Sequence, residues 1–227
     1  MISVIIPTLL KVDRLYKTLI ELSLCDVVGE IILIDNSENN KIFNIPKLVH
    51  ILEHKNTYVN PAWNKGVSIA KYEKICILND DTWFDWSELS NISKFIKEDV
   101  GMIGMSPNNW DNQDGNLKLY RPLPDGKTAQ GFRPNGFGCC FFIHKKNWDP
   151  IPEDLKIWAG DDWLFYRSKK PNYILEGLKC GGHMSFTSDD ITFKNEFDQI
   201  KQNDMINMRS YVQSGVVENY LIGTIWW

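Results

Sequence analysis

The chain has 227 residues, of which 43% are hydrophobic and 24% are charged, and its formal net charge is -4. This length suits one large α/β domain and is short for two full-sized ones. Because the lysines and arginines are scattered rather than gathered into a stripe, the composition argues against a nucleic-acid partner.

The cysteines and the apolar runs restrict the compartment. The five cysteines lack zinc-type spacing, and Cys139 and Cys140 are adjacent, which favours reduced thiols over a disulfide framework. Residues 1–10 are apolar but have no basic residue before them and no cleavage site after them, so we interpret them as a buried strand. No apolar run approaches the roughly 20 residues that span a bilayer. We therefore expect a soluble, cytoplasmic protein.

Three short, continuously apolar runs, residues 3–6, 30–34 and 74–78, predict strands that are buried on both faces, as in a parallel sheet. Between the first two runs, apolar residues recur at helical spacing. Between the second and third, Asn60 is placed to cap a helix that begins at Pro61. This alternation of strand and helix specifies right-handed crossovers and a Rossmann-like open sheet.

The next segment predicts a helix, a strand and a long loop. Asp85 and Glu88 resemble a capping box and predict a helix that continues to Ile96. A strand follows at residues 100–105. Residues 106–136 are dense in Asn, Asp, Gly and Pro without periodicity, which predicts a long surface excursion. Long loops in compact domains are often functional.

Regular structure resumes in the last third of the chain. The apolar run at residues 137–143 predicts a strand, and a helix is predicted to begin near Asp161 or Asp162. A final amphipathic helix after residue 190 is indicated by Phe193, Phe197 and Ile200.

Polar residues follow each of the first three predicted strands. They are Pro7 and Thr8, then Asp35, Asn36 and Ser37, then Asn79, Asp80 and Asp81. Ligands bind at the carboxyl ends of the strands in an open parallel sheet. Each group alone is also explained by turn formation, which favours Asp and Asn. Three groups in register predict a ligand-binding edge.

In order and spacing, four segments resemble glycosyltransferase family 2, a branch of the GT-A fold. These segments are Ser-Val-Ile-Ile-Pro-Thr at 3–8, Ile-Ile-Leu-Ile-Asp-Asn-Ser at 31–37, Trp-Asn-Lys-Gly at 63–66 and Leu-Asn-Asp-Asp-Thr at 78–82. The resemblance implies an α/β, Rossmann-like GT-A fold, with an open and mostly parallel sheet flanked by helices in a single domain over residues 1–227. It implies a nucleotide-sugar-binding half at 1–105 and an acceptor-binding and catalytic half at 106–227.

The resemblance also implies a set of nucleotide-sugar-binding residues. This set is Pro7, Thr8, Asp35, Asn36, Asn64, Lys65, Asn79 and Asp80. In the family pattern, Pro7 and Thr8 line the nucleotide pocket and Asp35 contacts the base or ribose. Asn64 and Lys65 belong to a helix start beneath the nucleotide.

Residues 79–81 occupy the place of the family's DxD motif, with Asn79 as a departure in the first position. The resemblance implies that Asp80 approaches the ribose or sugar and that Asp81 binds a divalent metal. A diphosphate beside two carboxylates needs a cation, and oxygen ligands favour Mg²⁺ or Mn²⁺. His183 resembles a carboxyl-terminal metal ligand of many GT-A enzymes. The alternative is that Asp80 and Asp81 only shape a turn.

Residues in the last third resemble the acceptor side of the family's site. Gly138 matches a glycine that lets the donor sugar approach the backbone closely. The ring of Trp158 can stack on a sugar face, and the alternative is that it packs in the core and anchors its loop. Asp162 matches the family's catalytic base, and Asp161 replaces the usual Glu before it. Adjacent side chains on a helix diverge by about 100°, so one of the two points at the acceptor. We expect Asp162 to be the base; the alternative is that both acids cap the helix.

Together these features predict an inverting glycosyltransferase that moves a hexose or deoxyhexose from a nucleotide diphosphate sugar to a glycan-type acceptor in glycan biosynthesis. Inversion follows from the resemblance. Asn79 and Asp161 leave open a catalytically silent nucleotide-sugar-binding module. A sugar-phosphate nucleotidyltransferase is less favoured, because residues 8–11 lack its Gly-rich basic loop. Residues 225–227 can pack, pair with another subunit or make a peripheral membrane contact.

Overall fold

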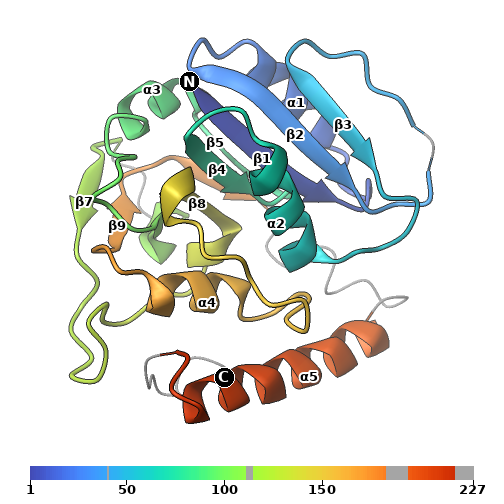
Figure 1. Ribbon diagram of the computed structural model, residues 1–227. Coiled ribbons are helices and arrows are strands. Elements are labelled where there is room, and N and C mark those ends of the chain that lie inside the picture. The colour runs from blue at the N-terminus through green and yellow to red at the C-terminus, as the bar shows by residue number, and fades with distance from the viewer. Residues whose placement is uncertain (40, 111–114, 183–193, 218–227) are drawn as a thin grey trace.

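The computed structural model describes residues 1–39, 41–110, 115–182 and 194–217. Within these ranges, eight strands form one sheet in the order β3-β2-β1-β4-β8-β6-β9-β7, and β10 pairs with β5 (Figure 1). The strands of the sheet are β1 Ile2–Thr8, β2 Val28–Asp35, β3 Leu48–Leu52, β4 Lys74–Leu78, β6 Ile103–Met105, β7 Lys118–Tyr120, β8 Cys140–His144 and β9 Tyr173–Glu176. The separate pair is β5 Thr82–Phe84 and β10 Cys180–Gly182. The α-helices are α1 Leu15–Ser23, α2 Val59–Ile69, α3 Leu89–Ile92, α4 Gly160–Arg167 and α5 Lys194–Gln213.

Four parallel strands, β3, β2, β1 and β4, form the first half of the sheet. Every residue of β1 is buried, because helices cover both faces. Val4 and Ile6 belong to the core cluster that contains residues of α1, whereas Ile5 belongs to the cluster that contains residues of α2. This is the period of two that a strand imposes on its side chains. Burying one such side chain fully stabilises the fold by about 1.5–3 kcal/mol.

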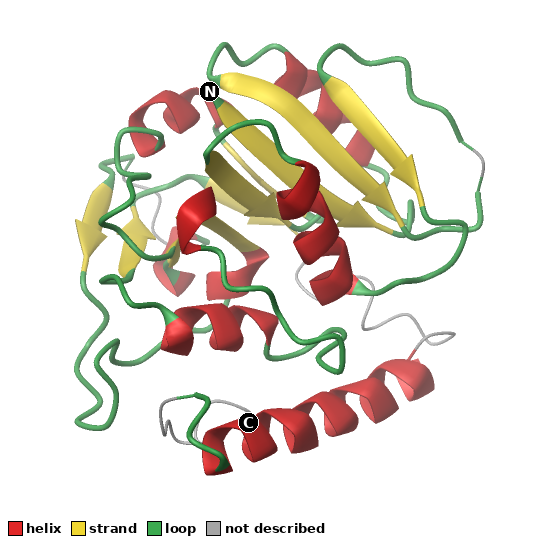
Figure 2. Ribbon diagram, viewed as in Figure 1, coloured by secondary structure: helices red, strands yellow, loops and turns green. Residues whose placement is uncertain are grey.

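The second half of the sheet is mixed. β8 runs antiparallel to both β4 and β6, β9 is parallel to β6, and β7 runs antiparallel to β9 (Figure 2). Helix α4 contributes Trp163, Leu164 and Phe165 to the same core cluster as α2. Helix α5 lies alongside α4 (Figure 1). The open, mostly parallel sheet flanked by helices that the sequence predicts is therefore confirmed.

Two predicted helices need correction, one at its start and the other at its end. Asn60 does not cap α2, because the helix begins one residue before it, with Tyr58 at the cap position. The predicted helix after Asp85 is shorter than expected. The carboxylate of Asp85 accepts the N–H of Ser87 as a cap, but a 3-10 turn and a single α-helical turn end the element at Ile92 rather than Ile96.

Within the described residues, five strands were missed by the sequence pattern: β3, β5, β7, β9 and β10. The predicted long excursion at 106–136 is confirmed for most of its length, although β7 lies within it. The predicted final helix is present as α5, whereas Phe193 lies outside the described residues.

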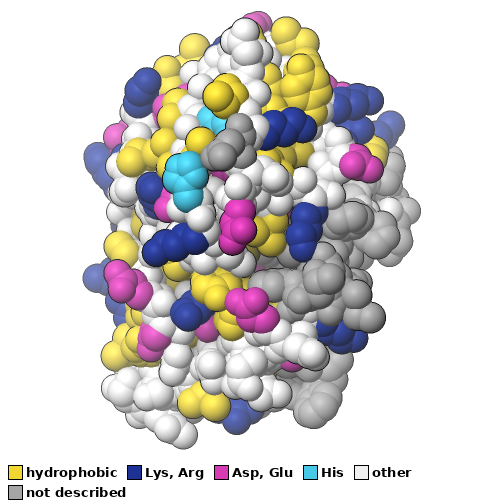
Figure 3. Space-filling view, turned by 90° about the vertical axis from the view of Figure 1, so that its right-hand side faces the viewer, with side chains coloured by type: hydrophobic (Ala, Val, Ile, Leu, Met, Phe, Trp, Pro, Cys, Tyr) yellow, Lys and Arg dark blue, Asp and Glu magenta, His cyan; other side chains and the backbone are white. Residues whose placement is uncertain are grey.

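No helix in the described part of the chain is long and apolar enough to cross a membrane. Figure 3 shows basic, acidic and apolar side chains interspersed on one face.

Gly66 sets the distance between α2 and the sheet. A Cβ added at this position would lie 2.4 Å from Cγ2 of Ile5. We therefore expect Gly66→Ala to lower the free energy of unfolding by about 1–3 kcal/mol through overpacking. The opposing gain from better helix propensity is about 1 kcal/mol, and the β-branched Ile5 has little freedom to move.

Urea unfolding of Gly66→Ala measures this effect. The exposed neighbour Ser68 on the same helix provides the matched control, because Ser68→Ala removes no buried contact. A Gly66→Ala midpoint equal to or above that of the wild type contradicts the packing described for α2.

Candidate active site

Polar side chains meet at the carboxyl ends of β1, β2 and β4. Thr8 and Asp35 are register partners at the ends of β1 and β2. The Thr8 hydroxyl donates to Oδ2 of Asp80 at 2.6 Å and accepts the N–H of Leu10 at 2.9 Å. Three groups that are far apart in sequence therefore lie at one edge of the sheet, as the order of the strands predicts.

The carboxylate of Asp35 is fully buried and makes internal contacts through both oxygens. Oδ1 accepts the N–H of Ser37 at 2.9 Å, and Oδ2 lies 3.0 Å from Nε2 of His50. The amide oxygen of Asn36 accepts the hydroxyl of Thr57 at 2.7 Å. These contacts fix the loop that follows β3. A direct contact between Asp35 and a base or ribose stays a prediction.

The turn after β4 carries the acidic pair. The N–H of Asn79 donates to the carbonyl of Cys139 at 3.0 Å, and the N–H of Thr82 donates to the carbonyl of Asn79 at 3.1 Å. Burial raises the pKa of Asp80 to about 7, while the hydrogen bond from Thr8 lowers it and the Asp81 charge raises it. Asp81 is half-buried. The backbone bond to Cys139 places this turn against the start of β8.

A buried arginine joins the two acids at the amino end of α4. Nε of Arg133 donates to Oδ1 of Asp162 at 2.5 Å, and NH1 of Arg133 lies 2.9 Å from Oδ2 of Asp161. The side chain of Asp162 is fully buried, whereas that of Asp161 is 17% exposed. Burial raises the pKa of Asp162 to about 6, although Arg133 lowers it. Burial lowers the pKa of Arg133, but the two carboxylates more than offset this and hold it above its usual range.

The two halves of the chain meet at Gly138 and Cys139. A Cβ added at Gly138 would lie 2.4 Å from Oδ2 of Asp161, so glycine leaves the room that this carboxylate occupies. Burial, together with the charges of Asp81 and Asp161, raises the pKa of Cys139 to about 12, although the charge of Arg133 lowers it. Both carboxylates therefore act on the same short segment, Asp81 from the turn after β4 and Asp161 from α4.

Asn64 and Lys65 are engaged elsewhere. The amide of Asn64 donates to the carbonyl of Ile151 at 2.7 Å and accepts from the N–H of Ile151 at 3.0 Å and from Nε1 of Trp148 at 3.1 Å. Lys65 pairs with Glu53. Both residues lie in the second turn of α2 rather than at its start. The contacts of Asn64 attach the segment after β8 to α2.

Trp158 packs against α5. Its ring lies edge-on to Phe197 with centroids 6.1 Å apart, and Nζ of Lys201 lies 4.3 Å from its centroid. His183 and residues 225–227 lie outside the described residues. The last described residue before His183 is Gly182, which pairs with Thr82 beside Asp81.

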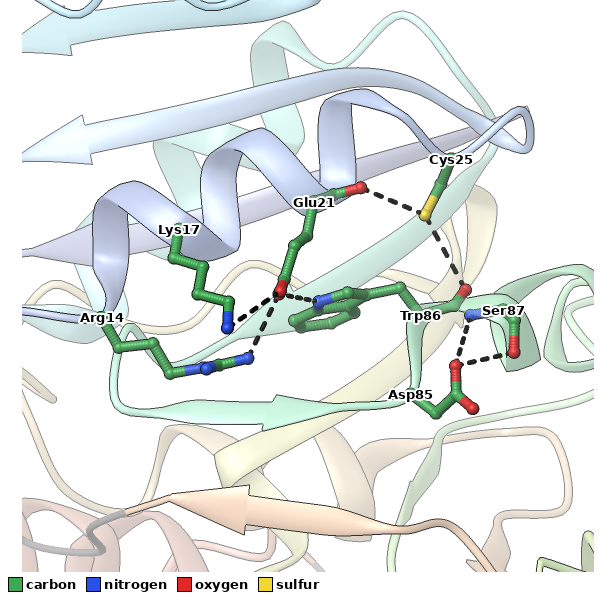
Figure 4. Close-up of polar contacts among 7 residues, drawn as sticks. All are labelled: Arg14, Lys17, Glu21, Cys25, Asp85, Trp86 and Ser87. Atoms are coloured by element: carbon green, nitrogen blue, oxygen red, sulfur yellow. Dashed lines mark hydrogen bonds and ion pairs between the residues drawn. The ribbon is translucent and has the colours of Figure 1, made fainter.

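A polar cluster that the sequence analysis missed attaches β5 to α1. The carboxylate of Glu21 accepts Nε1 of Trp86 at 2.9 Å and pairs with Arg14 at 3.2 Å (Figure 4). The guanidinium of Arg14 lies 4.3 Å from the centroid of the Trp83 ring. Trp83 and Trp86 follow the acidic turn closely, so this cluster fixes the chain directly after Asp81. Arg14 and Glu21 are separated from that turn by several strands and helices, so no local sequence spacing predicts their contact with it.

The glycosyl transferase family 2 model matches residues 3–148, so the chain belongs to this family. Two similar solved structures are Staphylococcus aureus TarS 1-349, at 16% identity and a TM-score of 0.55, and HddC from Yersinia pseudotuberculosis, at 16% identity and a TM-score of 0.52. The first match covers 76% of this chain and 57% of that chain, and the second covers 80% and 93%. At this identity they show the fold alone, and it is the GT-A fold that the sequence predicts. No curated protein sequence matches the chain.

Arg133 compensates two carboxylates, one of them buried, and this makes it a strong determinant of stability. We expect Arg133→Met to lower the free energy of unfolding by about 3–5 kcal/mol at pH 8, because it leaves the buried Asp162 charge without its cation. The folded-state pKa of Asp162 then lies further above its unfolded value. Between these two pKa values the folded protein therefore binds more protons than the unfolded chain does. As a result, the loss of unfolding free energy in Arg133→Met becomes smaller as the pH falls from 8 to 5.

Urea unfolding at pH 5 and pH 8 measures both effects. Adding Asp162→Asn to Arg133→Met should recover part of the loss at pH 8, since it removes the unpaired charge. The exposed Arg121 is the matched control, and Arg121→Met should change little. If Arg133→Met loses the same unfolding free energy at pH 5 and at pH 8, the role given to the Asp162 charge is wrong.

Proposed function

We propose that the chain is an inverting, metal-assisted glycosyltransferase that moves a hexose or deoxyhexose from a nucleotide diphosphate sugar to a glycan-type acceptor. One observation carries the proposal: the turn that bears Asp81 bonds to Cys139 through the N–H of Asn79, and Asp161 lies against the neighbouring Gly138, so acids from different halves of the chain flank one segment. Membership of glycosyl transferase family 2 supports the reaction class. The division into a nucleotide-sugar half at 1–105 and an acceptor half at 106–227 is part of the proposal.

We assign the general base to Asp161 rather than to Asp162. The family pattern favours Asp162, but its side chain is fully buried and bonded to Arg133. Asp161 is partly exposed and lies against Gly138, where the absence of a side chain leaves room for its carboxylate. A general base must come within hydrogen-bond reach of the proton that it takes. In this proposal Asp162 holds Arg133, and Arg133 orients Asp161.

The proposed step is a single displacement. Asp161 takes the proton of the acceptor hydroxyl while that oxygen forms a bond to the anomeric carbon of the donor. The bond between this carbon and the diphosphate oxygen breaks, and the nucleoside diphosphate leaves with the bonding electrons. Attack from the face opposite the leaving group inverts the configuration.

The oxygen ligands at the acidic turn fit a cation that is also bound by the substrate. The described residues contain no group of three or more His, Cys, Asp and Glu side chains that forms a metal site. Mg²⁺ at a phosphate site usually has one or two protein carboxylates, with phosphate oxygens and water as its other ligands. We propose that Asp81 supplies such a carboxylate for Mn²⁺ or Mg²⁺, with His183 as a second candidate ligand. The bound cation would offset the negative charge of the leaving diphosphate.

The donor is proposed to lie along the carboxyl ends of β1, β2 and β4. Thr8 and Asp80 form a hydrogen-bonded polar pair at this edge, and Pro7 lies next to Thr8 in β1. One similar solved structure, with a TM-score of 0.51 and 16% identity, is Staphylococcus aureus TarS 1-349 in complex with UDP. UDP and UDP-sugars are therefore the first ligands to test. The cytoplasmic location and a peripheral membrane contact stay predictions of the sequence.

Asp161→Asn tests the base. We expect turnover, measured as release of free nucleoside diphosphate from a matched nucleotide sugar and acceptor, to fall by about 10²–10⁴-fold, because an amide cannot accept the proton. UDP affinity, measured by calorimetry, should stay within about threefold of wild type, since Asp161 does not hold the nucleotide.

The exposed Asp154, on the loop before α4, is the matched control. Asp154→Asn should retain wild-type turnover. Unchanged turnover in Asp161→Asn removes this residue from the mechanism. Binding of a nucleotide sugar without turnover in the wild type favours the silent binding module.

Metal removal tests the role of Asp81. Dialysis against EDTA should abolish turnover, and added Mn²⁺ or Mg²⁺ should restore it. Asp81→Asn should raise the cation concentration at half-maximal turnover by about tenfold or more, because a neutral amide oxygen binds a hard cation less strongly than a carboxylate does. Full turnover in EDTA contradicts metal dependence.

A further inference from the structure

The buried face of α5 carries a charged residue. The buried side chains of this helix are Ile200, Asp204 and Met208, spaced four residues apart. This spacing places them on one stripe that faces the rest of the molecule. A carboxylate on an apolar stripe destabilises the fold unless hydrogen bonds compensate its loss of water. Asp204 is 1% exposed, so it requires such partners.

Three consecutive backbone amides provide these partners. Oδ1 of Asp204 accepts the N–H of Lys156 at 3.0 Å, and Oδ2 accepts the N–H groups of Ile157 and Trp158, both at 2.8 Å. Converging N–H groups of successive residues form a concave site for an anion. Here the anion is a side chain from a helix more than 40 residues further along the chain.

Asn60 holds the same segment from α2. Its backbone N–H donates to the carbonyl of Lys156 at 2.9 Å, and its side-chain amide donates to the carbonyls of Leu155 and Trp158, both at 3.1 Å. A Cβ added at Gly160 would lie 2.1 Å from Oδ1 of Asn60, so the close approach of Asn60 to position 160 requires glycine there. The segment is therefore held through its N–H groups by α5 and through its carbonyls by α2.

The held segment leads directly into the proposed base. Ala159 has a φ of 60°, in the left-handed region, and it precedes α4 without a side-chain cap. Asp161 is the second residue of that helix. Because no side chain caps the helix, the direction in which α4 begins depends on residues 156–158. Any shift of these residues would move the carboxylate of Asp161 with the first turn.

Other contacts of α5 hold the remainder of α4. The ring of Tyr211 lies edge-on to Trp163 with centroids 5.1 Å apart, and NH1 of Arg167 donates to the carbonyl of Val216 at 2.6 Å. Figure 1 shows α5 running alongside α4. Helix α5 therefore covers α4 along its length, and its residue Asp204 hydrogen-bonds to the backbone of residues 156–158.

We propose that Asp204 is a positioning residue for Asp161: through the amides of Lys156, Ile157 and Trp158 it fixes the start of α4 and the place of the catalytic carboxylate. This inference rests on the proposed function. It assigns a part in the reaction to a residue that does not touch substrate. The α5 helix then belongs to the catalytic unit.

Asp204→Asn tests the inference, because one amide oxygen cannot accept three N–H bonds and the amide NH₂ opposes them. We expect kcat to fall about 10–100-fold, as a small misplacement of a catalytic group does. The KM for the donor and the Kd for UDP should stay within about threefold, since the nucleotide edge is unchanged. Backbone hydrogen exchange at residues 156–158 should accelerate at least about tenfold.

Two variants on the same helix separate positioning from lost stability. Asp198→Asn removes an exposed carboxylate and should change nothing. Ile200→Ala removes buried packing and lowers the free energy of unfolding while the carboxylate of Asp204 stays in place. If kcat falls as much in Ile200→Ala as in Asp204→Asn at equal loss of stability, positioning by Asp204 is refuted.

A second variant covers the case in which Asp204→Asn does not fold. Asp204→Glu keeps the buried carboxylate but lengthens its side chain by one methylene, which displaces the acceptor oxygens from the three N–H groups. This variant should lower kcat at least about threefold with UDP affinity unchanged, and an unchanged kcat overturns the inference. If the wild type shows no transfer with any donor, the proposed function fails. Hydrogen exchange in Asp204→Asn still decides whether Asp204 holds the segment.

Discussion

The ion pairs of Arg133 are the contact on which the rest of the site depends. Two carboxylates at the amino end of α4, one of them fully buried, are compatible with folding because a buried guanidinium compensates both. The helix dipole adds a smaller favourable contribution at this end. Arg133 lies near the end of the long excursion, so the same contact attaches that excursion to the helix. Charge compensation, rather than apolar packing, therefore joins these two parts of the molecule.

Gln130 makes a second polar attachment of the excursion. Its amide donates to the carbonyls of Ser168 and Lys170 and accepts the N–H of Asn172, in the segment that follows α4. Arg133 is attached to the amino end of the same helix. The excursion is thus anchored at both ends of α4 by buried polar side chains, while most of residues 121–129 are exposed. The excursion therefore has one part that is attached to α4 and its flanks, around Gln130 and Arg133, and another part that lies on the surface, at residues 121–129.

The fold could be predicted largely from local patterns. Continuous apolar runs mark β1, β2 and β4 because these strands are buried on both faces, and the polar residues after them mark the binding edge. β3 escaped this reasoning because His50 interrupts its apolar run and its residues are only half-buried. β5, β7, β9 and β10 have three or four residues each, too few for a period to be recognised.

The site could be predicted only in part, because contacts between distant residues decide which side chains are free. Local spacing shows that Asp161 and Asp162 point in different directions, but Arg133 decides which of them is buried. Asn64 follows the family pattern, yet its partner Ile151 lies 87 residues away. The family model ends at residue 148, before α4 begins, so the assignment of roles in α4 and α5 comes from their contacts.

The contact of Asp204 with residues 156–158 also has a consequence for protein synthesis. The three amide groups leave the ribosome between 46 and 48 residues before the carboxylate that binds them. The parallel strands and their polar edge are complete well before that point in translation. Until α5 has been synthesised, the first turn of α4 therefore lacks the anchor that Asp204 provides. Ordering of the amino end of α4 is in this way tied to the completion of α5.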